Sequence, residues 1–190
     1  MRAPIIRVRL GAARALRTLV PVPHDPGMND HSGPDASARA ARAAAALGRE
    51  ILADIPLTRA MGLSIVACDS GSLTLAAPLA PNINDKGCAF GGSLASLMTL
   101  AGWGLIKLAT DARELDCEIY VQDSTIRYLA PVWQDFVAVA RLAEGEHFDD
   151  FFGAITARGK GRLRVHCTVP LAHGGAAATL EARFVALAKR

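Results

Sequence analysis

The 190-residue chain is 51% hydrophobic and 21% charged, a composition typical of a globular protein that is large enough for one well-packed domain. Its net charge of +3 comes from the first 45 residues, where seven arginines outnumber three aspartates; the rest holds fourteen Lys or Arg against fifteen Asp or Glu. A near-neutral body excludes the basic surface that nucleic-acid binding requires. The four cysteines form no C-x-x-C pair, which predicts a reducing, cytoplasmic compartment and no metal site.

Residues 1–37 are predicted to form a disordered, basic N-terminal extension. The first 23 residues carry arginines and no acid, and these arginines interrupt the continuous apolar core that a secretory signal needs. Residues 24–37 are rich in proline, glycine and polar side chains, as linkers are. Met28 lies within this linker and is a candidate for the true first residue. The folded domain is therefore expected to span residues 38–190.

A helix and a hairpin are predicted before the apolar centre of the chain. Residues 38–54 are alanine-rich and predict a helix, which Pro56 ends. Residues 63–68 and 72–77 are strand-like and flank an Asp-Ser-Gly turn, so they predict a β-hairpin.

The most apolar stretch, residues 91–109, predicts a buried helix. No charged residue occurs between Lys86 and Lys107. Several glycines make this helix slim, and because each costs about 1 kcal/mol in a helix interior, close approach of a sheet is expected to compensate. About 20 apolar residues could also cross a bilayer. Polar residues just upstream and strand-like segments on both sides favour the buried helix over a membrane span.

Strands dominate the second half of the chain. In order, the predicted elements are strands over 117–132 and 135–144, a short helix over 147–157, and strands over 161–171 and 179–188. The first two of these strands are predicted to be antiparallel neighbours joined by a turn at Pro131–Gln134. This order predicts an α+β fold in which an antiparallel sheet wraps around the helix over 91–109.

Two motifs resemble those of a known family. The first is LAPNINDKGCAFGGS (79–93), with AGWG (101–104) following it, and the second is QDSTIRYLAPV (122–132). Over residues 50–188 the chain resembles the hotdog-fold thioesterases of the YiiD C-terminal type. The resemblance implies a hotdog fold and hydrolysis of acyl-CoA or acyl-carrier-protein thioesters without a cofactor. It also implies a homodimer or a dimer of dimers, with sites between subunits.

The start of the helix over 91–109 is the predicted catalytic centre. The N–H groups of Gly91, Gly92 and Ser93 lack intrahelical partners and have the helix dipole behind them, so they predict an oxyanion site. Glycine has no Cβ and leaves the approach to these groups open. Asn84 is predicted to orient a water molecule or the carbonyl, although an amide cannot take a proton. By default, a loop asparagine is a turn residue.

Two carboxylates are candidates for the general base. Asp123 is the first choice, because a partly buried carboxylate within a β-rich run needs a hydrogen bond or a function. Its structural alternative is a pair across strands with an arginine, such as Arg127 of a neighbouring subunit. Asp85 is the second choice, but it neighbours Lys86 in a solvated loop. Related enzymes often carry a loop histidine and a helix carboxylate, where this chain has Phe90 and Thr99.

The side chains predicted to bind substrate are Phe90, Ser93, Gln122 and Ser124. Two other functions remain open. A non-catalytic acyl-thioester binding module could use the same fold. A hydratase or dehydratase is a further option, which the missing helix carboxylate and loop histidine disfavour.

Overall fold

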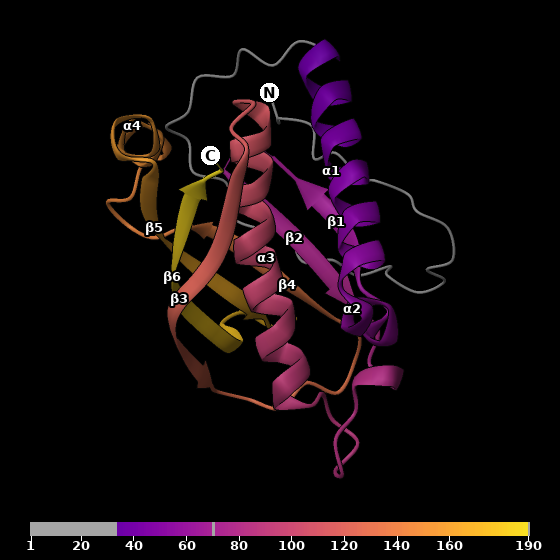
Figure 1. Ribbon diagram of the computed structural model, residues 1–190. Coiled ribbons are helices and arrows are strands. Elements are labelled where there is room, and N and C mark those ends of the chain that lie inside the picture. The colour runs from indigo at the N-terminus through magenta and orange to yellow at the C-terminus, as the bar shows by residue number, and fades with distance from the viewer. Residues whose placement is uncertain (1–33, 70, 190) are drawn as a thin grey trace.

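The computed structural model describes residues 34–69 and 71–189, which form one antiparallel sheet curved around a long helix (Figure 1). From the N-terminal side the elements are α1 (Pro34–Asp54), α2 (Pro56–Met61), β1 (Ser64–Cys68), β2 (Ser72–Ala77), the 3-10 helix η1 (Ala80–Asn82), α3 (Gly91–Ala112), β3 (Cys117–Tyr128), β4 (Phe136–Leu142), α4 (Phe148–Arg158), β5 (Lys160–Pro170) and β6 (Ala176–Ala188). The predicted α+β hotdog architecture is confirmed.

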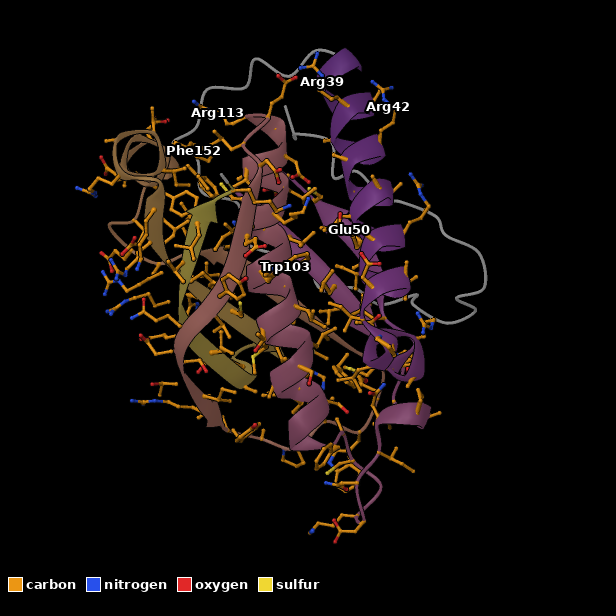
Figure 2. The ribbon with its side chains drawn as sticks, viewed as in Figure 1. Arg39, Arg42, Glu50, Trp103, Arg113 and Phe152 are labelled. Atoms are coloured by element: carbon orange, nitrogen blue, oxygen red, sulfur yellow. The ribbon has the colours of Figure 1, made fainter. Side chains whose placement is uncertain are left out.

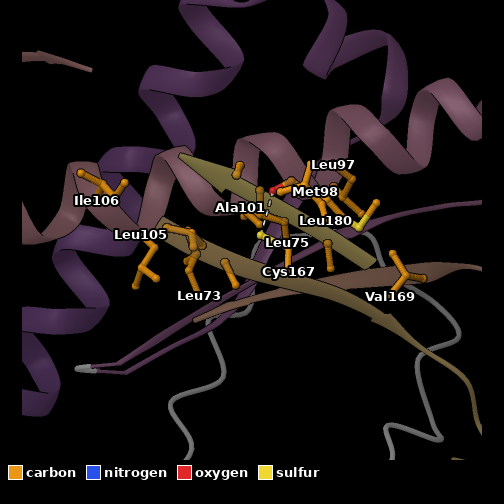
Figure 3. Close-up of a cluster of buried hydrophobic side chains, with 14 of the residues drawn as sticks. Leu73, Leu75, Leu97, Met98, Ala101, Leu105, Ile106, Cys167, Val169 and Leu180 are labelled. Atoms are coloured by element: carbon orange, nitrogen blue, oxygen red, sulfur yellow. Dashed lines mark hydrogen bonds between the residues drawn. The ribbon is translucent and has the colours of Figure 1, made fainter. Parts of the chain in front are cut away.

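Helix α3 is enclosed by the sheet along most of its length. No residue from Gly91 to Thr110 is exposed, because the strands direct alternate side chains onto this face. An added Cβ at Gly104 would lie 2.7 Å from Leu73, and one at Gly102 would lie 3.0 Å from the Phe184 ring. Glycine is therefore required where α3 and the sheet approach closely. Figure 3 shows part of this core, which includes Leu73, Leu75, Leu97, Met98, Ala101, Leu105, Ile106, Cys167, Val169 and Leu180.

By length and hydropathy, α3 is the one helix in the described residues that could cross a membrane. Its packing explains the same composition in another way, since Leu97, Met98, Ala101 and Ile106 are fully buried within the domain. The structure therefore places the predicted helix in the core of the domain.

Helix α1 covers the sheet beside α3 (Figure 1). It buries Ala44, Leu47 and Ile51 in the shared core. Glu50 of α1, labelled in Figure 2, lies 3.5 Å from Lys107 of α3, so the two helices are also joined by an ion pair. Helix α1 begins at Pro34, four residues before its predicted start. The rest of the predicted extension, residues 1–33, lies outside the described residues.

The strand order is β1-β2-β4-β5-β6-β3, which corrects one prediction. The strands over 117–132 and 135–144 were expected to pair, but β4 pairs with β2 and β5, and β3 pairs with β6. The connection between β3 and β4 explains the difference. Its Val132 carbonyl accepts a hydrogen bond from Ala89 N at 2.8 Å, and its Asp135 carboxylate accepts one from Leu79 N at 2.8 Å. These two bonds hold the connection against residues that precede α3, and the strand that follows, β4, pairs with β2.

Strand β3 forms one edge of the sheet, with β6 as its partner among the described strands. Most of its residues are exposed, including Tyr120 at 50% and Val121 at 46%. It is held to α3 by Trp103, whose indole Nε1 donates to Ile119 O at 3.2 Å (Figure 2). A 12-residue edge of mixed polar and apolar side chains is therefore open in the single chain.

Helix α4 packs against β5 near the C-terminal end of α3. Arg113 lies over the Phe152 ring, 4.7 Å from its centroid, and its guanidinium lies 3.2 Å from Asp149 (Figure 2). Phe151 and Ile155 pack against Gly161 of β5, where a Cβ would meet both side chains and the Phe151 carbonyl at 2.8 Å. The glycine therefore lets α4 lie directly on the strand.

Candidate active site

The first turn of α3 presents unpaired N–H groups. The N-cap residue Phe90 is extended, with φ −66° and ψ 132°, and its side chain makes no capping hydrogen bond. Leu94 N donates to Phe90 O at 3.1 Å and begins the intrahelical ladder. Within the described residues, no acceptor lies within hydrogen-bond distance of the N–H groups of Gly91, Gly92 and Ser93. These three donors, with a 22-residue helix behind them, can stabilise a negative charge.

A cavity of about 360 Å³ adjoins the first of these donors, because Gly91 contributes to its lining. It lies between the start of α3 and the end of β3, and Leu94, Leu129 and Pro131 contribute to its mainly apolar wall. Tyr128 closes one side, because its hydroxyl donates to Gly91 O at 3.1 Å and its ring lies 3.4 Å from the place of a Cβ on Gly91. The arrangement can hold an apolar chain next to the donors. We refer to this cavity as the helix-start pocket.

Asn82 fixes the start of the helix and was missed as a site residue. The side chain is 2% exposed, and its amide donates to Met61 O at 2.8 Å and to Pro78 O at 2.7 Å. The backbone carbonyl of Asn82 accepts a hydrogen bond from Phe90 N at 2.7 Å. One residue thus ties the N-cap of α3 to α2 and to the end of β2. Its sequence context, an asparagine after a proline, is that of an ordinary turn residue and gives no signal of burial.

Asn84 forms a turn in the loop that projects from the domain before α3 (Figure 1). Its Oδ1 accepts a hydrogen bond from Lys86 N at 2.8 Å, and its Nδ2 donates to Cys88 Sγ at 3.2 Å. Both polar atoms of the side chain are therefore engaged within the loop. Asp85 lies at the loop tip, where its carboxylate pairs with Lys86 at 2.8 Å and both side chains are exposed.

Asp123 lies apart from the helix start. It is opposite Arg183 on β6, and the two side chains lie 3.6 Å apart. The residues on either side of Arg183, Ala182 and Phe184, face the core, so Asp123 faces away from α3. The expectation of a partly buried carboxylate is wrong, because the Asp123 side chain is 59% exposed. In the single chain it has a cross-strand arginine partner, as its structural alternative expected, but that partner is Arg183 of the same chain and not Arg127.

The four predicted substrate-binding residues are divided between two faces. Phe90 and Ser93 lie at the start of α3. Ser124 is opposite the buried Ala182 and therefore faces α3, although it is exposed. Gln122 lies at a β-bulge on the outer side, where its Oε1 accepts a hydrogen bond from Arg162 Nε at 3.1 Å.

The four cysteines are all free thiols. Burial raises the pKa of Cys167 to about 12, and burial followed by the charge of Asp69 raises the pKa of Cys68 to about 11. Neither thiol can therefore supply a thiolate nucleophile at neutral pH. Residues 34–69 and 71–189 contain no group of three His, Cys, Asp or Glu side chains that could hold a metal ion.

Comparisons with known proteins identify the family and the fold of the chain. Residues 44–188 match the family described as "Putative thioesterase (yiiD_Cterm)". A crystal structure of a protein of unknown function from Chlorobaculum tepidum is 27% identical, with a TM-score of 0.74 and coverage of 79% of this chain and 97% of that chain. A crystal structure of a protein from Shewanella oneidensis, described as a "putative thioesterase", is 28% identical, with a TM-score of 0.68 over 77% of this chain and 98% of that chain. Because the family match covers most of the sequence, the chain belongs to the YiiD C-terminal thioesterase family and has its hotdog fold.

Proposed function

We propose that the protein is an acyl-thioesterase that hydrolyses acyl-CoA or acyl-carrier-protein thioesters. The observation that carries this proposal is the set of free N–H groups in the first turn of α3, at Gly91, Gly92 and Ser93, of which Gly91 lines the helix-start pocket. The thioester carbonyl would accept hydrogen bonds from these groups while the acyl chain occupies the apolar pocket. Family membership supports the same chemistry.

The proposed reaction is a direct attack of water on the thioester carbonyl. Negative charge develops on the carbonyl oxygen, and preorganised N–H donors stabilise it more strongly than they stabilise the neutral carbonyl. A base takes the proton from the attacking water, the C–S bond breaks, and the thiolate leaves with a proton. A carboxylic acid and a free thiol are the products. No cofactor is needed for these steps.

The decisive test measures free thiol released from acyl-CoA and acyl-carrier-protein substrates of increasing chain length. Turnover of at least one series is expected. If the protein binds acyl-CoA but releases no thiol from any substrate, it is instead the non-catalytic binding module. Neither the thioesterase nor the binding module requires a carboxylate in α3. The first carboxylate of this helix is Asp111, near its C-terminal end, so the hydratase alternative remains disfavoured.

The general base is proposed to be Asp123, with Asp85 as the second candidate, although in the single chain the Asp123 side chain faces away from α3 and Asp85 is paired with Lys86. Asp123→Asn is expected to lower kcat by about 10²–10⁴-fold, because a general base typically contributes that much. Arg183→Ala is the matched control, since it removes the same ion pair and keeps the carboxylate. The kcat of both variants and their thermal unfolding should be measured together. If both variants retain wild-type turnover, or lose it equally, Asp123 is not the base and Asp85 becomes the candidate.

We further propose that the chain forms a homodimer, alone or within a dimer of dimers, through the open edge of β3. Strand β3 presents 12 residues of unpaired edge in the single chain, with Tyr120, Val121 and Tyr128 exposed, and a long unpaired edge is a template for pairing with another strand. An antiparallel pairing of two β3 strands would bring the end of one strand, Tyr128, beside the start of the other, Cys117. The helix-start pocket of one subunit would then lie against the other subunit.

A charge on this edge is expected to separate the subunits. Val121→Asp places a carboxylate on an exposed apolar position of β3, where unpaired charge opposes strand pairing. Light scattering at micromolar concentration should give the mass of a dimer or tetramer for the wild type and of a monomer for this variant. Leu57→Asp is the control, because Leu57 is 53% exposed on α2, away from the edge. A monomeric wild type would contradict the proposed assembly.

A further inference from the structure

A second cavity, of about 490 Å³, lies between α4 and the first half of β5. Strand β4 ends at Leu142, which is opposite Val165, so the earlier residues of β5 have no β4 neighbour. Helix α4 spans this gap. We refer to the space as the α4 groove. It is separate from the helix-start pocket and shares no residue with it.

Three cations line the α4 groove without ion-pair partners in the described part of the chain. Arg158 ends α4, and Lys160 and Arg162 are exposed residues of β5. No carboxylate of residues 34–69 or 71–189 lies within 4.0 Å of any of them. Arg162 is instead held by a neutral group, the Gln122 side chain, at 3.1 Å. Its guanidinium is thereby oriented without being neutralised.

Two acidic side chains also line the groove, and they do not balance its charge. Glu146 is already paired with Arg164, whose Nε donates to it at 2.7 Å. Asp150 is the remaining carboxylate of the lining. One free acid therefore accompanies three free cations. A net positive groove of this size favours a ligand with more than one negative charge.

We propose that the α4 groove binds the phosphate-rich nucleotide end of a CoA thioester. Arginine forks and lysine ammonium groups bind phosphate oxygens through charge-assisted hydrogen bonds, and a CoA thioester carries its phosphates at the end opposite the acyl group. This inference rests on the proposed thioesterase function and on the proposed dimer. It makes acyl-CoA, rather than the carrier protein, the substrate class.

The position of the groove fits a substrate shared between two subunits. Within one chain, the groove adjoins the C-terminal end of α3, and the 22-residue helix separates that end from the helix start by about 33 Å. In an antiparallel β3 pair, the helix start of the partner subunit lies instead near Cys117. Lys160 is two strands away from β3, at about 10 Å. The pantetheine arm of CoA has about as many bonds along its chain as four or five amino-acid residues. When extended, the arm therefore spans about 15 Å.

Calorimetric titration of the full chain with CoA tests the proposal. The Lys160→Ala/Arg162→Ala double variant and Arg158→Ala are expected to raise the Kd for CoA by about tenfold or more. Arg49→Ala is the control, because Arg49 is an exposed cation of α1 outside the groove, and its Kd should match the wild type. Binding should weaken as salt is added. Pantetheine, which lacks the phosphates, should bind all four proteins alike.

The kinetics separate failure of this inference from failure of the proposed function. In the groove variants, KM for acyl-CoA should rise while kcat stays near the wild-type value. Normal hydrolysis with unchanged KM in these variants would overturn the groove assignment and leave the thioesterase proposal intact. Loss of CoA affinity in the groove variants of a protein that hydrolyses nothing would support the groove and reject the thioesterase. ADP binding that CoA does not displace would overturn the assignment to CoA.

Discussion

A Gly92→Val variant is expected to lose at least about 10²–10³-fold in kcat, the cost of one lost oxyanion donor. A Cβ at Gly92 would lie 2.3 Å from the Phe90 ring, so the valine and the displaced ring would both crowd the first turn of α3. The branched side chain would also cover the N–H groups that the carbonyl must reach. Steady-state hydrolysis of the best acyl substrate gives kcat and KM for the variant and the wild type.

Gly153→Val is the matched control for this experiment. Gly153 lies in the middle of α4, and a Cβ there meets nothing within 4 Å. The same change of residue in a helix should leave turnover unchanged, since it adds no contact and blocks no donor. Wild-type kcat in Gly92→Val would show that the helix start does not polarise the carbonyl.

An Asn82→Ala variant is expected to lower the free energy of unfolding by about 2–4 kcal/mol. Its amide satisfies the carbonyls of Met61 and Pro78 at 2.8 and 2.7 Å, and a buried acceptor left without a donor costs about 1–3 kcal/mol. Urea unfolding followed by circular dichroism measures the loss.

Asn84→Ala supplies the comparison for stability. Asn84 is only partly buried, and its side-chain hydrogen bonds stay within its own loop, so its loss should cost less than about 1 kcal/mol. Equal destabilisation by the two substitutions would contradict the structural role given to Asn82. The role predicted for Asn84 from the sequence, orienting water or the carbonyl, would require its side chain to leave these loop hydrogen bonds, and it predicts a lower kcat without a large change in stability.

Local patterns predicted most of the secondary structure. The helix over 91–109 is visible as an uncharged, glycine-rich run, and the β1–β2 hairpin is visible from its turn. The pairing of strands that lie far apart in the sequence was harder to predict. Adjacent strands often form hairpins, but the hydrogen bonds of Val132 and Asp135 direct β4 to β2 instead. No local pattern encodes those contacts, because their partners precede α3.

The candidate site was predictable where it depends on the helix start alone. Gly91, Gly92 and Ser93 could be assigned from their position, since any helix leaves its first N–H groups unpaired. The role of Tyr128 as a wall of the helix-start pocket could not be assigned, because it depends on β3 crossing the first turn of α3. The exposure of Asp123 likewise depends on a bulge at Gln122 and on the face that β6 presents.

The place of β6 in the sheet has a consequence for synthesis of the chain. It is the last strand in sequence, yet it lies between β5 and β3, and its pairs with β3 join residues at least 50 positions apart. While the nascent chain is still on the ribosome, β3 therefore has neither of its edges covered. Contacts of such long range form slowly and leave apolar strands open to aggregation. A chain truncated by a stop codon before Ala176 would lack β6, so both edges of β3 would stay uncovered.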